Sequence, residues 1–268
     1  MIRLAAALLA TSALAAPAFA ADFGMAAPMG ATYSAPATSA DWTGFYVSVF
    51  GGATFNPATP GVLQLDQDLD GNFSEPLVAP LAAAFGTNFI GSHDGGFTGG
   101  IAAGYDMQID QFVVGGVIDI AFVDYADRQS GFSSTPASYT ELRELNALGT
   151  VRARAGYLVT DNLLAYVHGG LAAGDARYTF VSTNPNRTST GGSDMAVGYQ
   201  IGGGLETMIT ENIGLGVEYA YTNLGESDFN TRFTNAPFVV ANPAGTDARG
   251  SDRVFDFHTV KATLSYKF

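Results

Sequence analysis

Side chains that could do chemistry are scarce in this chain of 268 residues, which contains no cysteine and only three histidines. The absence of cysteine removes disulfides, thiolate nucleophiles, zinc ribbons and iron–sulfur clusters. Three histidines leave little material for a histidine-based metal site. The net charge of -13 at pH 7 repels nucleic-acid phosphates, so we expect no nucleic-acid partner.

One acidic segment, Asp66-Gln67-Asp68-Leu69-Asp70-Gly71, matches the first half of a calcium-binding loop. Alternating carboxylates ligate the ion in such a loop, and the glycine permits its sharp turn. The twelfth position, which should be a bidentate glutamate, is Leu77, and Glu75 comes two positions early. The favoured interpretation is a solvated acidic loop without a cofactor. The alternative is a Ca²⁺ or Mg²⁺ site at Asp66, Asp68 and Asp70.

Nucleophilic catalysis would require a serine with a base within hydrogen-bond reach. His258 is the best candidate base, but it lies on the apolar face of its segment. The position two residues further on, where a serine partner would stand, is Val260. The sequence therefore predicts no catalytic residue.

The remaining polar side chains recur at every second position of otherwise apolar segments. Nine of them are candidates for one shared polar surface: Asp106, Asp119, Arg152, Arg154, His168, Gln200, Glu206, Glu218 and Lys261. Such alternation is typical of a strand with one apolar and one polar face. It predicts eight strands, near residues 43–55, 96–108, 112–124, 145–158, 163–175, 195–209, 213–224 and 254–268.

The connections between these segments alternate between long and short. The short ones, at 109–111, 160–162 and 210–212, carry turn residues, and the long ones have about 40, 20, 19 and 29 residues. Short turns at one end, long loops at the other and an even strand number are typical of a transmembrane barrel. A soluble lipocalin-like barrel is the alternative, but its exterior needs about a quarter to a third charged residues, and only 14% of this chain is charged. We therefore predict an all-β, eight-stranded antiparallel transmembrane β-barrel of the outer-membrane type.

The chain begins with one charged residue, Arg3, an apolar stretch, and Ala18-Phe19-Ala20. This pattern predicts a secretory signal peptide at 1–20, cleaved after Ala20. Residues 21–40 are rich in Ala, Pro, Ser, Thr and Gly, which predicts a flexible leader. The barrel domain is then 41–268.

In such a barrel the polar faces point inward and the apolar faces meet lipid. Eight strands leave a lumen only just wide enough for side chains to fill, so a plugged interior of paired charges is favoured over a charged constriction that passes small polar solutes. Aromatic residues should form two girdles at the membrane interfaces. The inner girdle is Trp42, Phe45, Tyr105, Phe112, Tyr157, Tyr266 and Phe268, and the outer girdle is Phe55, Phe97, Phe122, Tyr125, Tyr221 and Phe255.

Two terminal motifs carry a family resemblance. Asp41-Trp42-Thr43-Gly44-Phe45-Tyr46-Val47 resembles the opening strand of the porin-like, eight-stranded outer-membrane proteins of alphaproteobacteria. The alternating segment from Val260 to Phe268 resembles the C-terminal assembly signal of outer-membrane proteins, with Tyr266 and Phe268 as its aromatic residues. Ser48 departs from the family, which often has glycine there, and the first long loop is unusually long.

The resemblance implies a location in the cell outer membrane, contact with outer-membrane lipid and lipopolysaccharide, and insertion by the outer-membrane assembly machinery through the last strand. It implies roles in envelope integrity, surface exposure and sometimes solute passage. We therefore expect a non-enzymatic structural or surface protein. The alternatives are a narrow porin-like channel and, less favoured, a lipid A-modifying enzyme of the outer leaflet.

Overall fold

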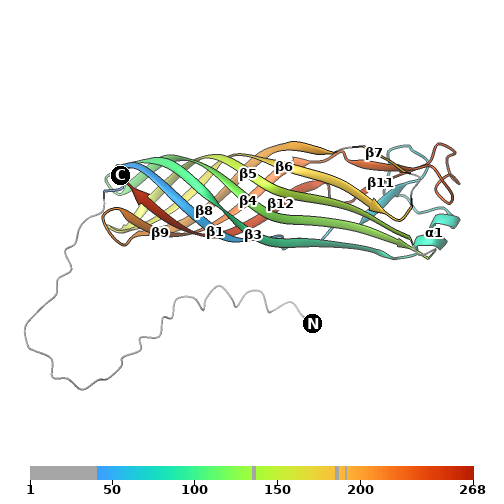
Figure 1. Cartoon of the computed structure of the whole chain (residues 1–268), viewed down its shortest axis with the longest axis horizontal. Helices are drawn as coiled ribbons and strands as arrows, with labels where there is room; N and C mark the ends of the chain where they lie inside the picture. The colour runs from blue at the N-terminus through green and yellow to red at the C-terminus, as the bar shows by residue number, and fades with distance from the viewer. Residues whose placement is uncertain (1–40, 135–136, 185–186, 191) are drawn as a thin grey trace, which may run out of the picture. The chain divides into compact units, whose positions relative to one another are not determined.

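The computed structural model describes residues 41–134, 137–184, 187–190 and 192–268. The predicted signal peptide and leader lie outside the described residues and stay predictions. Eight antiparallel strands form a closed barrel in the order β1-β12-β9-β8-β6-β5-β4-β3 (Figure 1). They are β1 (Gly44–Phe55), β3 (Phe89–Ile109), β4 (Phe112–Ser133), β5 (Ala137–Thr160), β6 (Leu163–Ser182), β8 (Ser193–Met208), β9 (Ile213–Glu226) and β12 (Val254–Lys267).

The first and last strands close the barrel. Val49 of β1 lies opposite Leu264 of β12 on one side and opposite Ile101 of β3 on the other. Closure gives every wall strand a hydrogen-bonded neighbour on each side, which is the condition for strands to cross a lipid bilayer. The predicted fold class is confirmed.

The apolar face of the wall points outward. On β4, Phe112, Ile118, Ile120 and Phe122 are each more than half exposed, whereas Asp119 between them is 7% exposed. This apolar band runs from residue 112 to 122 on β4, which matches the roughly 9–11 residues that a tilted strand needs to cross the hydrocarbon.

Four strands extend far beyond the predicted ends. β4 continues to Ser133 and β5 starts at Ala137, so the connection of about 20 residues predicted between them is wrong. Beyond Phe122 the outward positions of β4 include Asp124 and Arg128, which are exposed. The hydrogen-bond ladder therefore continues after the apolar alternation ends, because the outward face changes from lipid to water.

A register shift corrects the predicted facing of Leu145. Phe122 pairs with Ala147, but the next pair is Tyr125 with Leu145, three residues further along β4 and only two along β5. β4 therefore keeps its alternation, whereas β5 changes face between Leu145 and Ala147. Leu145 shares the parity of Val151 and Tyr157, the apolar face of the predicted strand, and was therefore expected to meet lipid. It is instead 1% exposed inside the barrel. An alternation of period two continued through such a bulge assigns every later residue to the wrong face.

Three members of the predicted girdles are also inside. Trp42, Tyr125 and Phe255 are at most 1% exposed and belong to interior clusters. The other girdle assignments include strongly exposed rings, such as Phe45 at 68% and Phe97 at 61%.

A small second sheet lies at the end of the barrel opposite the C-terminus (Figure 1). Its order is β2 (Leu63–Asp66), β11 (Thr246–Gly250), β10 (Asn230–Phe233) and β7 (Arg187–Thr190). Helix α1 (Ala79–Phe85) accompanies it and buries Leu81 and Phe85, one turn apart, against the sheet. None of the helices in the described ranges has the length and apolarity to span a membrane. We call this sheet, α1 and the strand ends beyond the apolar band the outer portion.

Candidate functional site

The structure brings the nine predicted polar residues together inside the barrel. Each of them is at most 8% exposed. We call the eight charged and histidine members the lumen network: Asp106, Asp119, Arg152, Arg154, His168, Glu206, Glu218 and Lys261. The ninth, Gln200, instead donates to Thr222 Oγ1 at 2.8 Å.

One half of the lumen network lies nearer the short turns, and we call it the lower half. It is built on Arg154 of β5. Its guanidinium binds Asp106 through two hydrogen bonds, Nε to Oδ1 at 2.9 Å and Nη2 to Oδ2 at 2.7 Å. The third nitrogen, Nη1, lies 3.0 Å from Glu206 Oε2. The central carbon of the guanidinium, Arg154 Cζ, also lies 5.1 Å from the ring centre of Tyr46 and 4.9 Å from that of Tyr166. The fork geometry of arginine suits this bidentate pairing.

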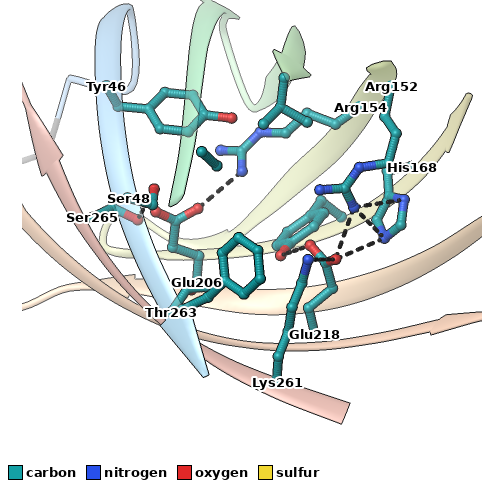
Figure 2. Close-up of a pocket in the computed structure, with 14 residues that line it drawn as sticks. Tyr46, Ser48, Arg152, Arg154, His168, Glu206, Glu218, Lys261, Thr263 and Ser265 are labelled. Carbon is teal, nitrogen blue, oxygen red and sulfur yellow. Dashed lines mark hydrogen bonds and ion pairs between the residues drawn. The ribbon is translucent and has the colours of Figure 1, made fainter. Parts of the chain in front are cut away.

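The upper half converges on Glu218 of β9 (Figure 2). Its carboxylate accepts from Arg152 at 2.8 Å and from the hydroxyl of Tyr166 at 3.0 Å. Lys261 lies 2.9 Å from it and His168 Nε2 lies 3.3 Å from it. Arg152 also reaches Asp119 at 2.6 Å, which joins β4, β5, β6, β9 and β12 through one set of contacts.

Glycines on β8, the strand next to β6, make room for the side chains of His168 and Tyr166. A Cβ at Gly202 would lie 2.7 Å from His168 Nε2, and one at Gly204 would lie 2.8 Å from the Tyr166 hydroxyl. The lumen network leaves a cavity of about 30 Å³, which has room for one or two water molecules.

The lumen network is electrically balanced by a residue that the sequence reading did not include. The nine predicted residues contain four acids and three strong bases. Lys267, at the end of β12, supplies the fourth base and lies 3.2 Å from Asp106. The signal was present, because Lys267 shares the polar parity of Lys261 on the same strand.

Apolar layers close the barrel on both sides of the lumen network. The inward side chains of β5 show the order of these layers. Leu145 and Leu148 lie between Arg152 and the outer portion, and Leu158 lies between Arg154 and the short turns. The layer above contains Val123, Tyr125, Leu145, Leu148, Ala172, Ala176, Leu224, Phe255 and Phe257. The layer below contains Trp42, Val113, Leu158, Leu164, Tyr166 and Met208.

A second polar group, which we call the outer cluster, lies above the upper apolar layer. It comprises His93, Asp127, Glu141, Arg143 and Asp252, whose side chains come from β3, β4, β5 and the connection before β12. Arg143 pairs with Asp127 and lies 3.6 Å from Asp252. Burial raises the pKa of Glu141 to about 7, against the opposing attraction of Arg143. This cluster was not predicted, because His93 and Asp127 fall outside the strand ends expected from the sequence.

The predicted loop-one metal residues are brought together only in part. Ligand oxygens of Asp66 and Asp68 lie within 4.8 Å of one from Glu75, whereas Asp70 is not in this group. Asp66 already accepts the backbone N–H of Leu69 at 2.8 Å and of Gly71 at 2.9 Å. Its carboxylate thus organises the turn. Ion binding here stays a prediction.

The remaining predicted residues lie on the outside of the wall. His258 Nδ1 is hydrogen-bonded to the exposed Tyr219 hydroxyl at 2.5 Å, and its ring stacks on Phe55. Tyr266 and Phe268 are 48% and 73% exposed, and their rings pack edge to face with centres 5.1 Å apart. They are placed where a partner could reach them, but their role as an assembly signal stays a prediction.

Comparison with known proteins identifies the family. A family model described as the outer membrane protein beta-barrel domain matches residues 6–268. The chain belongs to this outer-membrane β-barrel family. It is 31% identical to the 31 kDa outer-membrane immunogenic protein of Brucella melitensis, over 98% of this chain and 96% of that protein. It is 28% identical to the 22 kDa outer membrane protein of Rhizobium leguminosarum, over 66% of this chain and 68% of that protein.

Among solved structures, the outer membrane protein OprG of Pseudomonas aeruginosa matches with a TM-score of 0.46 and 12% identity, over 86% of this chain and 99% of that chain. Family membership rests on the sequence comparisons. They confirm the resemblance inferred from the two terminal motifs. The protein is an integral β-barrel of the cell outer membrane, so its short turns face the periplasm and its outer portion faces the cell exterior.

Proposed function

We propose that this outer-membrane barrel is a closed, non-enzymatic element of the envelope whose role is carried by the outer portion displayed at the cell surface. The observation that carries the proposal is the stacking of layers in the lumen. A balanced set of buried ion pairs lies between two apolar layers. A solute would have to break paired charges and also cross apolar packing. Each step is costly in a lumen of this diameter.

The outer portion has the features of a display surface. Its own apolar core includes Leu81, Phe85, Phe233 and Phe238, all at most 1% exposed. Three of the long connections contribute strands to one sheet. β2 pairs with β11, β11 pairs with β10, and β10 pairs with β7. An ordered surface structure is consistent with the name of the Brucella relative, which describes an immunogenic protein.

The side-chain contacts also favour a non-enzymatic role. Among the described residues, each histidine interacts with groups other than serine: His93 with Tyr125, His168 with Glu218 and His258 with Tyr219. A serine hydroxyl without a neighbouring base is a weak nucleophile. Mass analysis of lipid A from cells with and without the protein should therefore show no difference, and a modified lipid species that depends on the protein would contradict the proposal.

Planar bilayers test the closed lumen against the channel alternative. We expect no repeated discrete openings when the purified protein is added to the bilayer. Unitary openings whose ion selectivity changes in Arg152→Glu would contradict the proposal of a closed lumen. They would establish a path through the lumen network. Arg128→Glu is the matched control, because Arg128 pairs with Asp94 on the exposed outer surface.

A further inference from the structure

We propose that His93, Asp127 and Asp252 form a binding site for a divalent first-row transition metal, with Zn²⁺ as the expected ion. The site belongs to the outer cluster and is independent of whether the lumen conducts. His93 and Asp127 lie directly opposite each other on β3 and β4. Asp252 approaches from the connection before β12, and ligand atoms of the three side chains all lie within 4.8 Å of one another.

One buried atom on each of two of these side chains has no hydrogen-bond partner within the described part of the chain. The two atoms are Asp127 Oδ1 and His93 Nε2. The Asp127 side chain is 1% exposed and that of His93 is 4% exposed, and Asp127 Oδ1 lies 3.6 Å from His93 Nδ1. Buried polar atoms are normally satisfied, so this carboxylate oxygen, which faces an imidazole, is free to bind a cation.

Neighbouring residues hold the three side chains in place. Arg143 occupies the other oxygen of Asp127, with Nε 3.0 Å from Oδ2, and so leaves Oδ1 directed at the site. Gln129 fixes the backbone of Asp252 twice, by donating to its carbonyl at 2.8 Å and accepting from its N–H at 3.0 Å. Such supporting contacts are typical of metal sites, because they orient the ligands.

The donor set selects the class of ion. An imidazole nitrogen with two carboxylate oxygens suits Zn²⁺ and related metals, whereas Ca²⁺ and Mg²⁺ prefer oxygen ligands alone. Tetrahedral bonds of about 2.0–2.1 Å place ligand atoms roughly 3.3 Å apart, so the side chains need to close by about 1.5 Å at most. Water can supply the fourth ligand, because the Asp252 side chain is 25% exposed and opens the site to solvent.

The charge of the outer cluster is compatible with a divalent cation. Arg143 is the cation in contact with the proposed ligands. Its two carboxylate partners, Asp127 and Asp252, carry one more charge than the guanidinium balances when both are ionised, and a bound cation would offset that excess.

Zinc titration of the full chain, without a polyhistidine tag and stripped with a chelator in detergent, tests the proposal. Calorimetry should show one Zn²⁺ per chain, and Co²⁺ should give visible absorption bands of a site with nitrogen and oxygen ligands. His93→Ala and Asp252→Asn should each weaken Zn²⁺ binding at least about tenfold. His258→Ala removes a histidine from the outer wall and should leave the affinity unchanged. Asp68→Ala should also have no effect, which separates this site from loop one.

The folded state of each variant is checked by its electrophoretic mobility before and after heating. Asp252→Asn keeps the backbone contacts with Gln129, so it carries the test if His93→Ala fails to fold. The proposal is overturned if the wild-type protein binds no Zn²⁺ at about 1 mM, a very weak affinity. It is equally overturned if Asp252→Asn folds and binds as tightly as wild type.

Discussion

Replacing Arg154 by methionine should destabilise the barrel strongly. The substitution keeps an unbranched apolar stem but removes the guanidinium, and with it three hydrogen bonds, two to Asp106 and one to Glu206. Asp106 would retain Lys267 at 3.2 Å, whereas Glu206 would lose the cation that it contacts. Removing one partner of a buried ion pair typically costs about 3–5 kcal/mol, because the remaining charge is left uncompensated. We expect a loss in this range.

Urea unfolding of the protein in lipid vesicles measures this cost. The chain contains a single tryptophan, and Trp42 is fully buried at the periplasmic end of the lumen, so its fluorescence reports unfolding. Arg128→Met is the matched control, because that arginine is 45% exposed in its pair with Asp94 and should cost less than about 1 kcal/mol. Adding Glu206→Gln to Arg154→Met should recover part of the loss. If Arg154→Met lies within about 1 kcal/mol of wild type, the interpretation of the lumen network as a stabilising plug is refuted.

Three further predictions concern other parts of the molecule. Because the pKa of Glu141 rises from 4.5 to about 7 in the fold, the folded state binds the proton more tightly, and stability should fall as pH rises from 4.5 to about 7 and then level off. Glu141→Gln should remove this loss, which reaches up to about 3 kcal/mol; an identical pH dependence in both proteins would exclude it. Calcium titration should leave the circular-dichroism spectrum unchanged, and Asp68→Ala should behave like wild type; a saturable calcium response lost in this variant would support the loop-one site instead. Deleting Phe268 should reduce the amount of heat-modifiable protein in the outer-membrane fraction, and unchanged assembly would contradict the role of the last strand as an insertion signal.

The sequence was sufficient to predict the barrel because the relevant pattern is local. Each wall strand alternates between lipid and lumen, so Ile118 and Asp119 on adjacent positions already indicate opposite faces. The short turn at Asp110, which has a φ of 53°, is also visible as turn chemistry. The same alternation assigned Arg152 and Glu218 to one interior, although their pairing needs the fold.

The outer portion could not be predicted in this way because its contacts are not local. The four-residue strand β2 pairs with β11 through Leu65 and Ala248, which are far apart in the chain. Such short segments have no periodicity long enough to detect. The facing of Leu145 was wrong for a different reason, since a bulge leaves no signal in a period of two. His93 and Asp127 were not predicted because the outward side chains become polar beyond the apolar band. The alternation that marks β3 and β4 therefore stops before these strands end.

Cysteine accessibility tests the closed lumen most directly, because the natural chain contains no cysteine. Ala102 lines the small cavity in the lumen network, whereas the Asp228 side chain is 95% exposed in the outer portion. A charged, membrane-impermeant thiol reagent should modify Asp228→Cys rapidly. It should leave Ala102→Cys unmodified until the barrel is unfolded. Modification of folded Ala102→Cys at a rate comparable to that of Asp228→Cys would show that water and solutes enter the lumen, and would contradict the closed barrel.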